Sequence, residues 1–342
     1  MAAEKEHISN LELPPKVIDF MSKSWGIEKL HPPQLQAMPS VFSGKNILLA
    51  IPTASGKSLV AYLAIMKKLL VDEIGTKAVY IVPLKALASE KFDDLKSMAS
   101  AVNLTVGLGI GDSSSEAKKI EECDILVCTS EKLDSIIRNN SQTMSRVSIV
   151  VADEFHLMND STRGPTLEIN LTKLRFLRPD AQLVALSATV GNCQELAEWL
   201  DADLIQSDWR PVALEYSTFH DLHLEPRMVQ SSQVSKSPEL LNPPRDLEGP
   251  KTHPTWVVLK DTIDQEGQLL IFVGTRRSAE SEALKLSKRV FKVLEKENPE
   301  RLKKLNELSH TLEGRSQTAM GEKLSQCIVG GVAFHHAGLT HT

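Results

Sequence analysis

The sequence predicts an α/β fold, in which a doubly wound parallel sheet carries helices on both faces. Two observations support this class. Short apolar runs rich in β-branched residues recur up to Pro211, and segments with helical spacing alternate with them. Apolarity is continuous within each run, which indicates strands that are covered on both faces. In such folds ligands bind beyond the carboxyl ends of the strands.

The pattern places each element in turn. The expected strands of the first part span residues 46–51, 78–82, 104–110, 125–128, 147–151 and 183–186. The expected helices span residues 17–25, 32–42, 59–72, 87–101, 115–122, 131–138, 166–178 and 193–200. A polar, proline-rich stretch follows at about residues 220–254 and indicates a linker. Beyond it we expect strands at residues 268–273 and 328–334, separated by charge-rich helix from Arg276.

Length and composition limit the kinds of protein that this chain can be. A length of 342 residues suggests about two domains, and 42% apolar residues suffice for a core without disulfides. The net charge of -5 does not indicate nucleic-acid binding, although a basic groove on an acidic protein remains compatible with it. The four cysteines have no zinc spacing, and no signal peptide or membrane-spanning run is recognisable. We therefore expect a cytoplasmic, intracellular protein with no membrane partner.

Residues 52–58, which read PTASGKS, lie between an expected strand and an expected helix. Gly56 would let the backbone turn so that N–H groups at the helix N-terminus could bind phosphate. Lys57 and Ser58 would add an ammonium and a hydroxyl group. The strict phosphate-loop pattern is not met, because Ile51 occupies its first glycine position. An ordinary strand-turn-helix is the alternative reading of this segment.

Two adjacent carboxylates, Asp153 and Glu154, follow the apolar run at residues 147–151. In phosphate-loop ATPases a strand-end aspartate holds Mg²⁺, and a neighbouring glutamate activates water. The alternative is an acidic pair that a helix N-terminus favours. His335 and His336 do not indicate a metal site, because neighbours on a strand face opposite ways.

Further motifs occur in a fixed order along the chain. They are LHPPQ from Leu30, PLKALASEK from Pro83, TSEKLD from Thr129, DEFH from Asp153, SAT from Ser187, RPV from Arg210, FVGTRRSAE from Phe272 and GVAFHHAGL from Gly331. With PTASGKS, this series resembles the superfamily 2 helicases of the DEAD/DEAH-box kind. Within them it is most similar to the superkiller-type group that includes the archaeal Hjm-type DNA helicases.

The resemblance implies an organisation and a set of cofactors. It implies an N-terminal extension at residues 1–30, a RecA-like ATP-binding domain at 31–212, a linker at 213–258 and an incomplete second RecA-like domain at 259–342. ATP and Mg²⁺ are the implied cofactors. The implied ATP-binding residues are Gln34, Pro52, Thr53, Ala54, Ser55, Gly56, Lys57 and Ser58. Gln34 would read adenine, although a solvated helix glutamine is the alternative.

The resemblance also assigns catalytic roles. Lys57 would bind the β- and γ-phosphates, Ser58 and Asp153 would hold Mg²⁺, and Glu154 would activate water. His156 would complete the catalytic set by coupling the site to the rest of the chain. Nucleotide state would be coupled to domain movement by Ser187, Ala188 and Thr189. Buried histidines and small hydroxyl groups also have purely structural uses.

Nucleic acid would be held through its phosphates, and contacts of this kind do not depend on the base sequence. The implied contacts are Pro83, Lys85, Thr129, Ser130 and Glu131 in the first domain, and Thr275 and Arg276 in the second. Each of them, taken alone, could instead be a loop cap or an exposed side chain.

The expected function is that of an ATP-dependent helicase enzyme, a monomer that moves 3′ to 5′ on single-stranded or forked DNA. A role in DNA repair and replication-fork restart follows from the same resemblance, with a nucleoid association if the source is archaeal. An RNA helicase in RNA decay or remodelling is the alternative, and a nucleotide-switched scaffold without motor activity is a second. The family's arginine-finger motif and C-terminal domains do not follow Gly331–Leu339. Such an arginine finger raises the rate of ATP turnover ~10³- to 10⁵-fold. We therefore expect this chain, as a piece of a longer helicase, to bind ATP but to unwind duplexes poorly.

Overall fold

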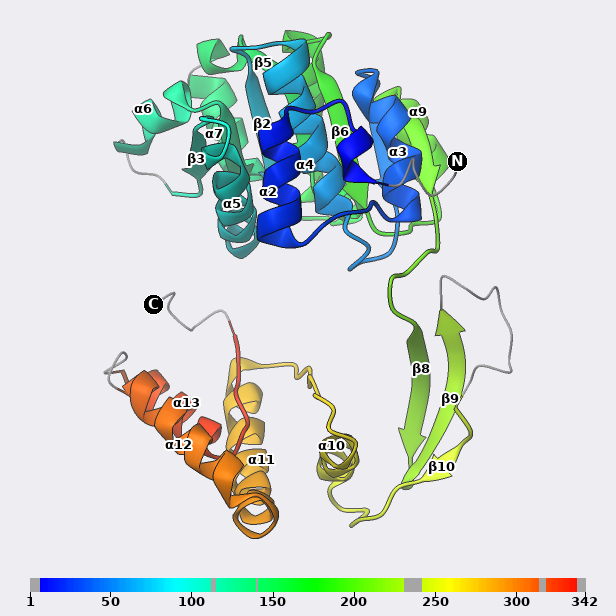
Figure 1. Ribbon diagram of the computed structural model, residues 1–342, viewed down its shortest axis with the longest axis vertical. Helices are drawn as coiled ribbons and strands as arrows, with labels where there is room; N and C mark the ends of the chain where they lie inside the picture. Colours follow the sequence, from blue (N-terminus) through cyan, green and yellow to red (C-terminus); the bar gives the residue numbers. More distant parts are fainter. Residues whose placement is uncertain (1–6, 112–114, 140, 231–241, 314–317, 337–342) are drawn as a thin grey trace. The chain divides into compact units, whose positions relative to one another are not determined.

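The computed structural model describes residues 7–111, 115–139, 141–230, 242–313 and 318–336 (Figure 1). The chain divides into two compact units. The first holds the described residues up to Tyr216 together with residues 228–230, and the second holds Ser217–Arg227 and the described residues from Asn242 onward. None of the described helices combines the length and apolarity that crossing a bilayer requires.

A seven-stranded parallel sheet forms the centre of the first unit. Its strands are β1 (Ile47–Ala50), β2 (Lys77–Val82), β3 (Val106–Gly109), β4 (Ile125–Thr129), β5 (Val147–Ala152), β6 (Gln182–Ser187) and β7 (Asp203–Gln206). The strand order is β3-β4-β2-β5-β6-β1-β7, and every paired neighbour runs parallel. This confirms the predicted doubly wound α/β class. Sequence analysis missed β7, an edge strand in which only Ile205 is buried.

Helices cover both faces of this sheet. In chain order they are α2 (Pro15–Trp25), α3 (Pro32–Phe42), α4 (Lys57–Lys67), α5 (Lys85–Ser100), α6 (Ser115–Glu122), α7 (Ser130–Asn139), α8 (Gly164–Leu177) and α9 (Cys193–Leu200). In β1, Ile47 and Leu49 join the core beneath α2 to α5, whereas Leu48 and Ala50 join the opposite core beneath α6 to α9 (Figure 1). Successive strand residues face opposite ways, so a strand buried on both faces is apolar throughout.

The segment before α3 belongs to the first unit. Ile8, Val17, Met21 and Leu30 are buried in the same core as the residues of α4. Sequence analysis set residues 1–30 apart as an N-terminal extension. In the structure residues 8–30 pack into the first unit, and the domain boundary at residue 30 stays a prediction. Their apolar spacing reflects burial against the sheet domain.

The second unit combines a small sheet with helices. Its sheet has the order β10-β9-β8, with β8 (Leu214–His220), β9 (His223–Gln230) and β10 (Arg245–Asp246). Four helices follow: α10 (Pro254–Asp264), α11 (Arg276–Glu297), α12 (Pro299–Glu313) and α13 (Ala319–Val329). Strands and the start of α10 therefore occupy much of the stretch predicted as a linker at residues 213–258. The Arg245 guanidinium joins β10 to α10, because it binds both carboxylate oxygens of Asp261 at 2.6 and 2.7 Å.

Two strands predicted for this unit were wrong. Residues 268–273 form no strand, and Leu270 and Phe272 are 77% and 87% exposed. At residues 328–334, α13 continues to Val329 and irregular chain follows. A parallel strand needs a neighbour for its backbone groups, and the described part of this unit contains no parallel strand pair. The RecA-like nature of the second unit stays a prediction.

Candidate nucleotide-binding site

The loop at residues 52–58 joins the carboxyl end of β1 to the first turn of α4. Ala54 and Gly56 both adopt left-handed backbone conformations, with φ of 61° and 75°. Gly56 is the N-cap residue, and α4 begins at Lys57. The first N–H groups of a helix have no partner within the helix, so this loop presents donors and a positive dipole end to an anion.

Gln34 braces this loop from α3. Its side-chain oxygen accepts a hydrogen bond from the His31 backbone N–H at 2.7 Å, and its amide nitrogen donates to the Gly56 carbonyl at 2.9 Å. Only 2% of Gln34 is exposed. Gln34 is therefore not a solvated helix glutamine, and it ties the predicted adenine-reading position to the phosphate loop.

Trp209 lies beside the same loop and was missed by sequence analysis. Its backbone carbonyl accepts a hydrogen bond from the buried Ser55 hydroxyl at 3.1 Å. Its ring is 4.5 Å from the His31 ring, centroid to centroid. The only sequence signal was its position next to the RPV motif.

Lys57 is buried at the start of α4, and its Nζ donates to the Ile51 carbonyl at 3.4 Å. Burial lowers the pKa of this ammonium group, while the charges of Glu154 and Asp153 act in the opposite direction. The structure thus brings the loop lysine within electrostatic reach of both carboxylates, although about a hundred residues separate them in the sequence. Strands β1 and β5 both end at this edge of the parallel sheet, with β6 between them.

Asp153 follows β5 and is held at both carboxylate oxygens. Oδ1 accepts the Glu154 backbone N–H at 2.8 Å, and Oδ2 accepts the Tyr80 hydroxyl at 2.8 Å. Glu154 itself has a left-handed backbone with φ of 50°, which is uncommon for a residue with a side chain. The chain therefore turns sharply at the two predicted catalytic carboxylates.

His156 connects these carboxylates to the SAT motif. Its Nδ1 lies 3.4 Å from the Ala188 N–H and 3.4 Å from Glu154 Oε2. An unprotonated Nδ1 accepts from Ala188, whereas a protonated Nδ1 can only donate to Glu154. The Ser187 carbonyl in turn accepts the Ile51 N–H at 3.2 Å, next to the phosphate loop. These contacts link His156 to Ser187 and Ala188, whereas Thr189 is exposed in the irregular chain after β6.

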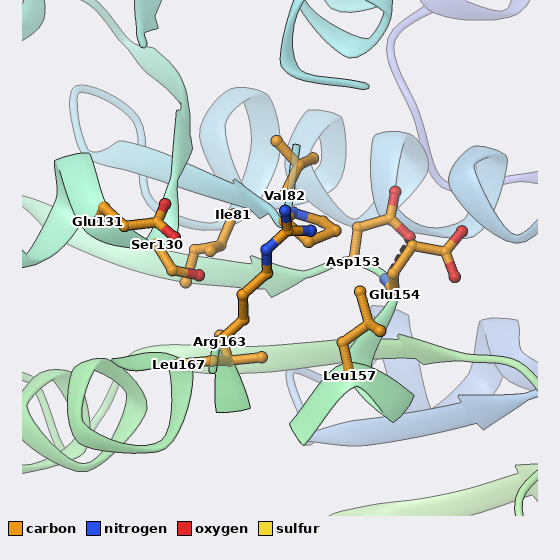
Figure 2. A pocket seen from close by; sticks show the side chains of 10 residues that line it. Ile81, Val82, Ser130, Glu131, Asp153, Glu154, Leu157, Arg163 and Leu167 are labelled. Carbon is orange, nitrogen blue, oxygen red and sulfur yellow. Dashed lines mark hydrogen bonds between the residues drawn. The ribbon is translucent and has the colours of Figure 1, made fainter. Parts of the chain in front are cut away.

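A small pocket adjoins Asp153 and Glu154 (Figure 2). It is lined by Ile81, Val82, Pro83, Ser130, Glu131, Asp153, Glu154, Leu157, Arg163 and Leu167. Figure 2 shows the Arg163 side chain extending between Ser130 and Glu131 on one side and the two predicted catalytic carboxylates, Asp153 and Glu154, on the other. Arg163 is the one cation among these lining residues, and sequence analysis missed it.

The predicted nucleic-acid contacts fall into two groups. Pro83, Ser130 and Glu131 line the pocket, and Lys85 lies exposed at the start of α5. Thr129 is buried, and its hydroxyl accepts the Lys132 backbone N–H at 3.3 Å. In the second unit Thr275 caps α11 by accepting the Ser278 N–H, and Arg276 is exposed. The two threonines thus have capping roles in the structure, and their contacts with nucleic acid stay predictions.

The donor set fits a magnesium nucleotide. Helix N–H groups and the Lys57 ammonium suit phosphate oxygens, and the Ser58 hydroxyl and Asp153 carboxylate are hard oxygen ligands of the kind Mg²⁺ prefers. Fold and site together define a nucleotide-binding α/β domain of the phosphate-loop class.

Comparison with known proteins gives the family. Residues 31–196 match the DEAD/DEAH box helicase family. This match covers the part of the chain that holds the site, and it confirms the resemblance seen in the motifs.

The chain is similar to named relatives over almost its whole length. It is 41% identical over 339 residues to the ATP-dependent DNA helicase Hel308 of Methanocella arvoryzae, a match that covers 97% of this chain and 43% of the relative. It is 45% identical over 320 residues to Hel308 of Thermococcus kodakarensis, covering 93% of this chain and 26% of the relative. The chain thus spans less than half the length of these relatives.

A solved structure shows a similar arrangement. The DUF1998 helicase MrfA, crystallised with DNA, matches 57% of this chain and 30% of its own chain with a TM-score of 0.51 and 25% identity.

Proposed function

We propose that the chain is the ATP-driven motor part of a DNA helicase. One observation carries the proposal: a buried lysine on a phosphate-type loop lies within electrostatic reach of two adjacent carboxylates at the end of β5. Lysine, hydroxyl and carboxylates in this arrangement are what ATP hydrolysis with Mg²⁺ uses. The similarity to proteins named ATP-dependent DNA helicases supports the same activity here.

Each residue has a role in this proposal. The loop N–H groups and Lys57 would bind the β- and γ-phosphates, and Ser58 and Asp153 would hold Mg²⁺, which would neutralise charge on the phosphates. Glu154 orients and deprotonates the attacking water. His156 transmits the state of Glu154 to Ala188, because its Nδ1 can serve only one of the two at a time.

The track is proposed to be single-stranded or forked DNA. Pro83, Ser130 and Glu131 line a pocket next to the hydrolytic carboxylates, and Arg163 gives that pocket a cation for a phosphate. By resemblance to the archaeal group, the proposal includes 3′ to 5′ movement and a role in repair and fork restart inside the cell.

Nucleotide binding and turnover test the proposal. The wild-type chain should bind a fluorescent ATP analogue with Mg²⁺, and single-stranded DNA should increase phosphate release. Lys57→Met should abolish binding. Lys67→Met is the matched control, since Lys67 is another buried lysine of α4 but pairs with Asp72 at 2.6 Å. A wild-type chain that binds no ATP, or equal binding by the Lys57 and Lys67 variants, would contradict the proposal.

The alternatives give different results in binding assays. An RNA helicase would prefer RNA in competition between single-stranded DNA, RNA and 2′-modified strands, because the 2′-hydroxyl distinguishes them. A scaffold without motor activity would bind nucleic acid equally well in the wild type and in Glu154→Gln, whatever the nucleotide. In a motor, Glu154→Gln should trap ATP and change nucleic-acid affinity.

A further inference from the structure

Tyr80 is a fully buried residue of β2 whose hydroxyl points at the proposed magnesium site. In the β2–β5 pairing Tyr80 lies opposite Val151, two residues before Asp153. Its Oη donates to Asp153 Oδ2 at 2.8 Å. Since Asp153 Oδ1 is already bonded to the Glu154 N–H, the phenol fixes the second oxygen and so the plane of the carboxylate.

The same hydroxyl has a second neighbour in the site. The Ser58 side chain lies beside the Tyr80 hydroxyl. Ser58 and Asp153 come from different parts of the chain, one from the first turn of α4 and one from the end of β5. The Tyr80 hydroxyl therefore bonds to one of the two residues that are proposed to hold Mg²⁺ and lies next to the other.

A buried tyrosine needs a hydrogen-bond partner wherever it lies, so this contact could be structural alone. Tyr62 shows that case. It is 3% exposed, its ring centroid is 6.0 Å from that of Tyr80, and its hydroxyl donates to Asp94 Oδ2 at 2.9 Å. Asp94 lies on α5 and has no part in the proposed site. The two tyrosines thus share residue type, burial and a hydrogen bond to a carboxylate, but only Tyr80 bonds to a carboxylate of the proposed site.

We propose that Tyr80 is a positioning residue that aligns Asp153, beside Ser58, for the magnesium ion of the bound nucleotide. Mg²⁺ demands near-ideal octahedral geometry, so ligand misplacement weakens its binding. Groups that orient metal ligands typically change metal affinity 10- to 100-fold when removed. The inference rests on the proposed nucleotide site and adds a residue that no motif identified.

The test is magnesium-dependent nucleotide binding, without turnover. A fluorescent ADP analogue is titrated at a series of Mg²⁺ concentrations and in EDTA. In Tyr80→Phe the Mg²⁺ concentration for half-maximal binding should rise about tenfold or more, while affinity in EDTA stays within twofold of wild type. In Tyr62→Phe both quantities should match wild type.

A second measurement keeps the test valid if Tyr80→Phe also lowers the stability of the protein. The melting temperature of each variant is measured with nucleotide alone and with nucleotide plus Mg²⁺, and the increment from Mg²⁺ follows from its binding. A smaller increment for Tyr80→Phe than for Tyr62→Phe supports the inference. Equal increments, or a Mg²⁺ midpoint for Tyr80→Phe within twofold of wild type, overturn it while the nucleotide site stands. A wild-type chain that binds no nucleotide overturns the proposed function itself.

Discussion

Replacing Gly56 by alanine should disrupt the phosphate loop through Gln34. A Cβ at Gly56 would lie 2.3 Å from Gln34 Nε2, so the glutamine amide must move. Moving it breaks the bonds to the Gly56 carbonyl and the His31 N–H, each worth about 1 kcal/mol. The left-handed backbone at φ 75° adds roughly 1 to 2 kcal/mol for a residue with a side chain. The variant should therefore lose about 3 to 4 kcal/mol of unfolding free energy.

Gly26 provides the matched control for this change. It caps α2 with φ of 65°, and a Cβ there would meet nothing within 4 Å. Gly26→Ala should lose only the backbone part, roughly 1 to 2 kcal/mol, in urea unfolding followed by circular dichroism. It should bind the fluorescent ATP analogue normally, whereas Gly56→Ala should bind at least about tenfold more weakly, which corresponds to 1.4 kcal/mol.

A double-mutant cycle decides whether Gln34 is responsible. Gln34→Ala removes the atom that the new Cβ would meet. The loss of unfolding free energy in the double variant should therefore be smaller than the sum of the two single losses, by about 1 kcal/mol or more. Strictly additive losses, or equal losses for the Gly26 and Gly56 variants, would refute the view that Gln34 braces the loop.

Three further predictions follow from the charges. Lys57→Met should raise the melting temperature of the nucleotide-free protein at neutral pH. Burial lowers the Lys57 pKa, so the charged ammonium destabilises the folded wild-type protein at any pH below that lowered pKa. The difference in melting temperature between variant and wild type should therefore shrink as pH rises toward 10.5. Glu154→Gln should keep nucleotide affinity within a few-fold but slow single-turnover phosphate release about 10²- to 10⁴-fold, and a smaller effect would exclude Glu154 as the base. Asp261→Asn should lose up to about 1 kcal/mol at neutral pH, because the bond from Arg245 lowers the Asp261 pKa and stabilises the carboxylate. That loss should fade as pH falls below about 3.9 through the lowered pKa, and a pH-independent loss in urea unfolding would contradict this assignment.

The sequence by itself determined the architecture of the first unit. Strands covered on both faces must be apolar at every position, so β1, β2, β4, β5 and β6 stand out as continuous runs, and the α/β class follows from their alternation with helices. The motifs also determined which residue types gather at the nucleotide site, since Lys57 and Asp153 each follow such a strand. Parallel strands end at one edge of the sheet, which places those residues near each other.

The same local pattern failed where the tertiary context differs. Residues 268–273 read as a buried strand, yet a strand forms only where a neighbour takes up its backbone groups, and the described sheet of the second unit, β10-β9-β8, does not include this segment. Packing also decided the place of the segment before α3, because its apolar residues complete the core of the first unit.

Only the tertiary structure decided the contacts that hold the site in shape. Gln34 reaches Gly56 across 22 residues, and Tyr80 reaches Asp153 across 73. Such bonds leave no periodic signal, because they depend on how separate elements meet around the sheet. Sequence identifies the groups that can hold phosphate and Mg²⁺, and packing fixes the direction in which those groups point.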